Sequence, residues 1–252
     1  MTAPAGEGFG RRLLDEPVEI GLVDYGMGNR RSVEKALEHV GATVTVTSDH
    51  ERLRAAAGLV LPGVGAFPRG MESLRELGLD ELLRERLAAG TPVLGICLGM
   101  QLAFERSTEL GGATGLGLIE GEVRKLPRVG TPSGAHPEGH TQGAHGEQAG
   151  EHGALKLPHI GWNEVSFSRE SPLTEGLPER CAFYHVHSFA PVPDDANDVL
   201  GVAEYSARFV SVVAKDSFYG VQFHPEKSSA AGLRLLANFA RMCAGVAVAV
   251  AP

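Results

Sequence analysis

The chain has few cysteines and little positive charge. Its three cysteines, Cys97, Cys181 and Cys243, are widely spaced and odd in number. This pattern argues against a disulfide framework and favours a reducing compartment, so a cytoplasmic location is expected. Lys and Arg number 23 against 31 Asp and Glu, which gives a formal net charge of −8. Because phosphate binding needs a concentrated positive surface, nucleic acid is not expected as a partner.

Long apolar runs are also lacking. No run approaches the roughly 20 residues that a membrane-spanning helix needs, so no membrane partner is expected. Residues 1–17 carry charges without the apolar core of a secretory signal and are predicted to form a flexible leader. Residues 244–252 are apolar but few, and are expected to form a C-terminal tail. The residues between, 18–243, are enough for one large domain.

The segment 127–155 has almost no apolar residues and is rich in Gly, Pro, His and Glu. A segment of this composition cannot bury a core, which predicts a low-complexity surface insertion. It contains four histidines, His136, His140, His145 and His152. Their spacings match no compact ligand set. A solvated linker is therefore favoured over a metal site, and no metal is expected.

Short apolar runs alternate with helical patterns in the first half of the chain. The strand-like runs are 18–23, 43–47 and 58–61, and the helical ones are 32–40 and 70–89. The second helix is expected to break near Gly78. This alternation predicts an α/β fold with a mostly parallel central sheet covered by helices and ligands bound at the carboxyl ends of the strands.

The second half has a different character. Short strand-like runs separated by turn residues indicate antiparallel additions to the sheet. These runs are 165–167, 182–186, 199–205, 210–216 and 220–223. A helix over 230–243, with apolar residues on one face, is expected to close the domain.

Cys97 lies in a Gly-Ile-Cys-Leu-Gly segment at 95–99, between a predicted buried strand over 92–96 and a predicted helix over 98–105. Small residues on both sides let a strand turn sharply into a helix and hold the central side chain in a strained, exposed position, which is a nucleophile elbow. A thiol with a free pKa near about 8.5 gains reactivity there when an imidazole favours the thiolate. Taken alone, this segment would favour Cys97 as a small buried apolar residue, as most free cysteines are.

A second reactive group, His224-Pro225-Glu226, directly follows the last predicted strand. A histidine beside a carboxylate can act as a base whose tautomer the carboxylate fixes. Both Cys97 and His224 come from strand ends, so they can meet at one edge of the sheet. The combination favours a Cys–His–Glu triad over a buried structural cysteine.

Six segments in order carry a family resemblance. Segments 95–101 and 220–228 resemble the triad-type, class I glutamine amidotransferases. Within that family, segments 24–29, 61–67, 158–163 and 184–188 are similar to the glutaminase subunits of imidazole glycerol phosphate synthase. The similarity runs from about residue 18 to residue 242 and is interrupted by the insertion.

The resemblance implies a three-layer α/β fold and hydrolysis of L-glutamine to glutamate and ammonia, with no cofactor. Cys97 is then the nucleophile that forms a γ-glutamyl thioester, His224 the base and Glu226 its orienting carboxylate. The expected oxyanion donors are the N–H groups of Leu98 and Val64. Expected substrate-binding residues are Gly63, Gly65, Gln101 and Ser188, with Phe189 where the family often has tyrosine.

The resemblance also implies a partner, because ammonia released into water is protonated and lost as a nucleophile. The family's partner is a HisF-type cyclase, a (β/α)8 barrel, which makes imidazole glycerol phosphate and an aminoimidazole carboxamide ribotide in histidine biosynthesis. Expected interface residues are Asn29, Trp162, Asn163, Tyr184 and Lys227. From the sequence pattern alone, Trp162 fits a core position as well as an interface. Alternative functions are a glutaminase feeding another synthase, a regulatory subunit without catalytic activity and, less favoured, a cysteine peptidase.

Overall fold

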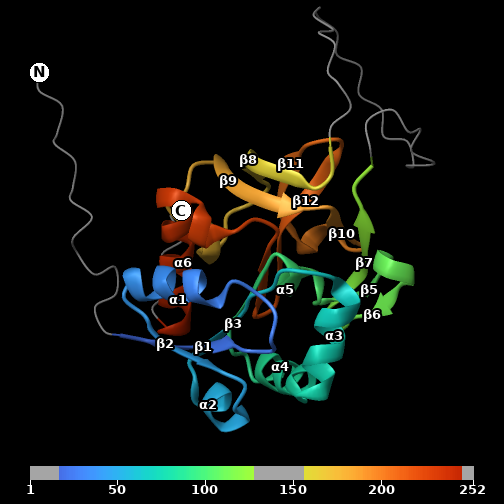
Figure 1. The fold of residues 1–252 in the computed structure, drawn as a ribbon. Helices are drawn as coiled ribbons and strands as arrows, with labels where there is room; N and C mark the ends of the chain where they lie inside the picture. Colours follow the sequence, from blue (N-terminus) through green and yellow to red (C-terminus); the bar gives the residue numbers. More distant parts are fainter. Residues whose placement is uncertain (1–16, 128–155, 246–252) are drawn as a thin grey trace, which may run out of the picture.

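A computed structural model describes residues 17–127 and 156–245 of the chain (Figure 1). The predicted leader (1–17), surface insertion (127–155) and tail (244–252) lie outside these ranges, apart from their border residues. Their predicted character is therefore left as an expectation from composition.

The central sheet has nine strands in the order β2-β1-β3-β4-β13-β12-β11-β8-β9. Its first five strands are all parallel, and the β/α alternation predicted this for four of them. The fifth, β13, was expected from the run 220–223 as an antiparallel addition, and this expectation is wrong because β13 pairs in parallel with β4. They are β1 (Glu19–Val23), β2 (Thr43–Thr47), β3 (Gly58–Leu61), β4 (Val93–Ile96) and β13 (Phe218–Val221). β4 and β13 are parallel neighbours, so the chain leaves both strands at the same edge of the sheet. Cys97 directly follows β4, and His224 lies three residues after the end of β13.

The remaining strands of this sheet are antiparallel, which confirms four of the five predicted additions. They are β12 (Arg208–Lys215), β11 (Val199–Glu204), β8 (His159–Phe167) and β9 (Arg180–His187).

Helices cover both faces of the sheet and make three layers (Figure 1). On one face, Ile20 and Val60 of the strands pack with Leu37 of α1 (Arg30–His39) and Leu236 of α6 (Ser229–Cys243). On the other face lie α2 (His50–Ala55), α3 (Phe67–Glu76) and α4 (Leu79–Ala88).

Alternation along the strands explains the two cores. Val60 belongs to the core under α1 and α6, whereas its neighbours Leu59 and Leu61 belong to the core under α3 and α4. Successive side chains of a strand point to opposite faces, so a strand buried on both sides reads as a continuous apolar run. Gly78, with φ of 65°, separates α3 from α4, as predicted.

The predicted helix over 98–105 is wrong beyond its first turn. Helix α5 spans only Leu98–Gln101, and the chain then enters β5 (Phe104–Ser107). Phe104 is fully buried, and β5 pairs with β7 (Ile119–Lys125) and β6 (Ala113–Thr114). Tertiary pairing therefore overrides the local helical pattern. With β10 (Phe189–Pro193), these strands form a second sheet in the order β10-β7-β5-β6 that the sequence pattern did not predict.

Candidate active site

Cys97 occupies the tight turn between β4 and α5, with φ of 54° and ψ of −108°. A positive φ is rare for a residue with a side chain and marks local strain. Glycine is required on both sides. A Cβ on Gly95 would lie 2.7 Å from the carbonyl oxygen of Gly99, and a Cβ on Gly99 would lie 1.8 Å from that of Leu61. The predicted elbow geometry is confirmed.

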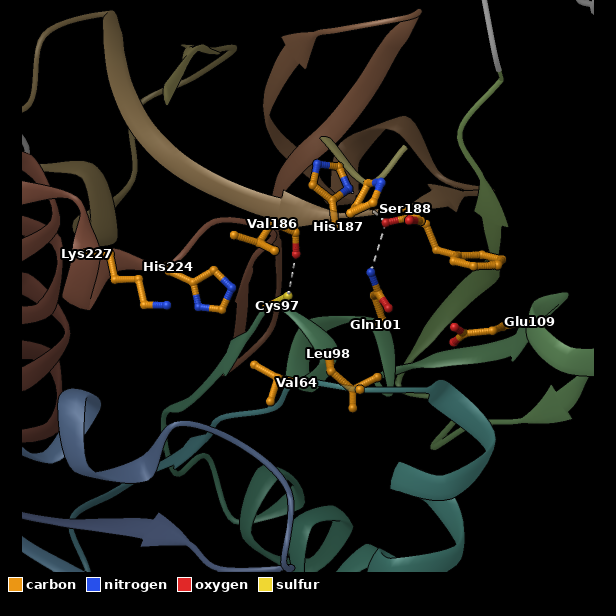
Figure 2. A pocket seen from close by; sticks show the side chains of 13 residues that line it. Val64, Cys97, Leu98, Gln101, Glu109, Val186, His187, Ser188, His224 and Lys227 are labelled. Carbon is orange, nitrogen blue, oxygen red and sulfur yellow. Dashed lines mark hydrogen bonds between the residues drawn. The ribbon is translucent and has the colours of Figure 1, made fainter. Parts of the chain in front are cut away.

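His224 and Glu226 lie in the turn that follows β13 and belong to one hydrogen-bonded pair. His224 Nδ1 is 3.1 Å from Glu226 Oε1, and both side chains are almost completely buried. Since the carboxylate accepts the Nδ1 proton, Nε2 is the ring nitrogen left for other partners. Cys97 and His224 line the same pocket (Figure 2). With Glu226 bonded to His224, the three residues predicted to form the triad are brought together.

The charges around His224 favour its protonated form. Burial alone would lower the pKa of His224, but interaction with the Cys97 sulfur and the Glu226 carboxylate outweighs it and raises the pKa to about 9. The imidazolium form of His224 is therefore favoured at neutral pH.

Gln222 and Val186 complete the surroundings of the sulfur. Gln222 Nε2 lies 3.6 Å from Cys97 Sγ and can donate to a thiolate. The Val186 carbonyl oxygen lies 3.8 Å from Sγ (Figure 2). Gln222 was not predicted as a site residue, although its position between the apolar residues 221 and 223 was an available signal. Its side chain is fully buried.

The predicted oxyanion donors do not converge in this structure. Leu98 N–H donates to the Gly63 carbonyl oxygen at 3.3 Å. The 63–64 peptide is trans, so its N–H, which belongs to Val64, points away from Leu98 N–H. The approach of the two segments needs glycine, because a Cβ on Gly63 would lie 2.8 Å from Leu98 Cβ.

The loop that carries Val64 is hydrogen-bonded at one end and has glycine at the other. Tyr25 Oη donates to the Pro62 carbonyl oxygen at 2.7 Å. On the other side, Gly65 has φ of 113°, a conformation that glycine adopts without cost. Val64 itself is 44% exposed. A rotation of the 63–64 peptide is thus confined to a short, glycine-flanked segment.

The pocket has a volume of about 270 Å³. Its lining includes the predicted oxyanion and substrate-binding residues Val64, Gly65, Leu98, Gln101 and Ser188, but not Gly63. The other lining residues are Cys97, Glu109, Pro158, Val186, His187, Phe189, His224 and Lys227.

Gln101 and Glu109 place acceptor oxygens at this pocket. Gln101 Nε2 donates to the Phe189 carbonyl oxygen at 3.0 Å and to Gln222 Oε1 at 2.9 Å. Both N–H bonds of the amide are then used, and Oε1 is left to accept from a ligand. The Glu109 carboxylate accepts from Phe67 N at 2.7 Å and is directed toward Gln101 (Figure 2). Glu109 was not predicted as a site residue, because it follows the unpredicted strand β5.

Two of the predicted interface residues, Trp162 and Asn163, project to opposite sides of β8. Trp162 is 55% exposed, so a core position for this residue is wrong. The centroids of the Trp162 and Tyr184 rings are 6.2 Å apart. Ile160, two residues before Trp162 on β8, is 59% exposed and extends the apolar face. Asn163 follows Trp162 directly and projects to the opposite side of the strand, where its amide donates to the Glu204 carbonyl oxygen at 2.7 Å.

The other two predicted interface residues lie at chain turns. Asn29 directly precedes α1 but makes no side-chain capping bond to the backbone, and its Nδ2 donates to Ser32 Oγ at 2.8 Å. Lys227 lines the pocket next to His224 (Figure 2).

Comparisons with known proteins agree with this geometry. The family model described as "Glutamine amidotransferase class-I" matches residues 21–243. The imidazole glycerol phosphate synthase subunit HisH of Bacillus cereus (strain G9842) is 47% identical over 221 residues, which are 87% of this chain and 93% of that protein. This chain belongs to the class-I glutamine amidotransferase family, in its HisH group. The HisH of Methylococcus capsulatus is 48% identical over 225 residues, which are 88% of this chain and 95% of the relative.

Solved structures show the amidotransferase fold at lower identity. A putative GMP synthase protein from Thermoplasma acidophilum superposes with a TM-score of 0.63 at 20% identity, covering 92% of this chain and 96% of that one. PurLQS from Thermotoga maritima gives 0.63 at 16% identity, covering 89% and 97%. Among the described residues of this HisH-group chain, no helix is long and apolar enough to cross a membrane. Within residues 17–127 and 156–245, no group of three His, Cys, Asp or Glu side chains could hold a metal ion.

Proposed function

We propose that the chain hydrolyses L-glutamine to glutamate and ammonia and supplies the ammonia to a cyclase for synthesis of imidazole glycerol phosphate and aminoimidazole carboxamide ribotide in histidine biosynthesis. The observation that carries the proposal is the Cys97 elbow facing the His224–Glu226 pair in one pocket of a HisH-group chain. HisH relatives are named as subunits of a synthase, which supports a role in an assembly.

In the proposed first step, the Cys97 thiolate attacks the side-chain amide carbon of glutamine and forms a tetrahedral intermediate. The C–N bond then breaks, and the His224 imidazolium gives its Nε2 proton to the leaving nitrogen, which departs as ammonia. The neutral imidazole next takes a proton from water, which attacks the γ-glutamyl thioester and releases glutamate and the thiolate. Glu226 keeps the Nδ1–H tautomer and stabilises the imidazolium.

The pocket offers complementary groups to the main-chain end of glutamine. Gln101 Oε1 and the Glu109 carboxylate are acceptors for the α-ammonium group. We assign the α-carboxylate to the segment around Ser188 and to Gly65, which line the cavity. Phe189 offers no hydroxyl at the position where the family often has tyrosine.

The oxyanion of the tetrahedral intermediate needs two N–H donors. In the present conformation of the 63–64 peptide, Leu98 N–H is bonded to the Gly63 carbonyl and Val64 N–H points away from Leu98 N–H. Rotation of the 63–64 peptide would release Leu98 N–H from the Gly63 carbonyl and turn Val64 N–H toward the site. We infer that the chain is nearly inactive alone and that the occupied partner favours the rotated peptide, which prevents wasteful hydrolysis.

We assign the partner, a HisF-type (β/α)8 cyclase, to the side of the molecule that includes the exposed face of Ile160 and Trp162. Asn29, Tyr184 and Lys227 would border this contact, and Asn163 would support it from behind β8. The three cysteines are all free, which suits the reducing cytoplasm as the location.

The test is glutamate release by the purified chain, with and without the cyclase and its ribotide substrate. We expect slow release alone and fast release in the stimulated complex, with Cys97→Ala inactive in both. Glutamate release that persists in Cys97→Ala would refute the proposed chemistry.

A further inference from the structure

Three buried histidines that the triad does not use lie beside the pocket. His159 is on β8, and His185 and His187 are on β9. Each is at most 5% exposed. His159 stacks on Tyr205 with ring centroids 4.0 Å apart. Only His187 reaches the pocket lining (Figure 2).

The hydrogen bonds of His159 and His187 fix where their protons lie. His187 Nδ1 is 2.9 Å from the Phe189 carbonyl oxygen, which can only accept, so Nδ1 carries the proton. His159 Nδ1 is 3.0 Å from His187 Nε2, which in the neutral ring is an acceptor. His159 therefore also carries its proton on Nδ1. Its own Nε2 faces Asn163 Nδ2 at 3.5 Å.

Both rings are neutral at pH 7. Burial lowers the pKa of His159 to about 4 and that of His187 to about 3. The neutral state is the one that the donor and acceptor pattern requires.

His187 donates to a carbonyl oxygen that also accepts a hydrogen bond from the pocket residue Gln101. The Phe189 carbonyl oxygen has two lone pairs, and it accepts from His187 Nδ1 and from Gln101 Nε2. Gln101 Nε2 donates next to Gln222 Oε1, and Gln222 Nε2 reaches Cys97 Sγ. A continuous hydrogen-bonded chain thus joins His159 to the nucleophile.

We propose that His159 and His187 are positioning residues of the glutaminase reaction, which hold the Phe189 carbonyl and through it the carboxamide of Gln101, so that Gln101 Oε1 faces the substrate ammonium. This inference rests on the proposed function. If the Gln101 amide turned over, its oxygen would face the Phe189 carbonyl and its N–H groups would face the ammonium, and both contacts would be repulsive. The histidine pair therefore favours glutamine binding without touching glutamine.

The test compares variants in the complete complex with the cyclase and its ribotide substrate. His159→Leu removes the donor to His187 and keeps the site apolar, whereas His159→Asn retains an N–H near the position of Nδ1. We expect His159→Leu to raise KM for glutamine about five- to tenfold, the effect of losing one buried hydrogen bond, with kcat changed much less. His159→Asn should restore most of the loss in KM.

His185→Leu is the matched control. His185 belongs to the same buried cluster, but its nitrogens contact Ser211 Oγ and the Phe183 carbonyl oxygen, outside the chain to Gln101. It should lower the melting temperature and leave KM unchanged. The inference is overturned if His159→Leu leaves KM unchanged, if His159→Asn fails to restore it, or if His185→Leu raises KM equally.

A spectroscopic measurement on the wild-type chain does not depend on the folding of any variant. Imidazole ¹⁵N spectra at pH 7 should show neutral rings protonated on Nδ1 for both His159 and His187. A proton on Nε2 of His187, or a charged ring, would overturn the inference. Failure of the underlying function would look different, because the wild-type complex would then release no glutamate.

Discussion

Replacing Val64 by proline should remove most of the partner-stimulated glutaminase activity and lower the basal rate far less. Proline has no backbone N–H, so Val64→Pro deletes the one donor that the rotated 63–64 peptide would bring to the oxyanion. In the structure described here, that N–H already points away from Leu98 N–H, because the Gly63 carbonyl holds Leu98 at 3.3 Å. The unstimulated chain therefore gains little from the donor.

The magnitude follows from the value of a single oxyanion donor. Removing one such donor costs on the order of 10² to 10³ in kcat. The assay is glutamate release with and without the cyclase and its ribotide substrate. Stimulation should fall by about that factor, since loss of a donor in the stimulated state alone removes the corresponding stabilisation.

Val64→Ala is the matched control, because it shortens the side chain and retains the N–H. Val64 is 44% exposed, so this change should alter both rates only slightly. Binding of the cyclase by Val64→Pro, measured by gel filtration, separates a lost donor from a lost complex. A bound Val64→Pro chain that is stimulated as strongly as the wild type would refute the switching role of this peptide.

Three further predictions concern the triad, its titration and the insertion. Cys97→Ala should abolish glutamine turnover while leaving fold and cyclase binding intact. Glu226→Gln should lower turnover less, because the nucleophile and the base remain. The measurement is the turnover rate of each variant. The His224 ring should titrate near pH 9 by NMR, with a lower midpoint in Cys97→Ala. Because the pKa of His224 in the folded chain is raised above 6.5, the stability that this residue adds is complete below pH 6.5 and is lost as the pH rises through 9. A midpoint near 6.5 would contradict the stabilisation of the charged His224 ring. Replacing residues 127–155 with a short Gly/Ser link should leave melting temperature and glutaminase activity nearly unchanged. The reason is that closing a flexible loop costs only about 0.6 kcal/mol for each doubling of its length. Loss of cyclase-coupled activity alone would instead identify the segment as a docking element.

The elbow and the first four parallel strands of the sheet could be predicted because local rules determine them. Gly95 and Gly99 flank Cys97 where a side chain would collide with backbone, and the apolar runs of β1, β3 and β4 are buried on both faces. Gly78 likewise breaks a helix through its own backbone conformation. These features need no knowledge of distant contacts.

The missed features depend on pairing between distant segments. Phe104 continues a helical pattern in sequence, yet it pairs with Ile119 in β7, and this places Glu109 at the pocket. Gln222 acquires its role only when β13 lies beside β4. The orientation of the 63–64 peptide depends on the hydrogen bond between Leu98 N–H and the Gly63 carbonyl, which cannot be predicted from the spacing of these residues in the sequence. The buried histidine pair likewise forms only when β8 pairs with β9.

Transfer of nitrogen from the glutamine amide into the cyclase product tests the central claim most directly. The complex would be given glutamine labelled with ¹⁵N in its amide, together with the ribotide substrate and excess unlabelled ammonium at neutral pH. We predict one glutamate for each imidazole glycerol phosphate formed, with the label retained in the imidazole. Product carrying mainly unlabelled nitrogen, or product formed without glutamate, would contradict the assignment of this chain as the source of the ammonia.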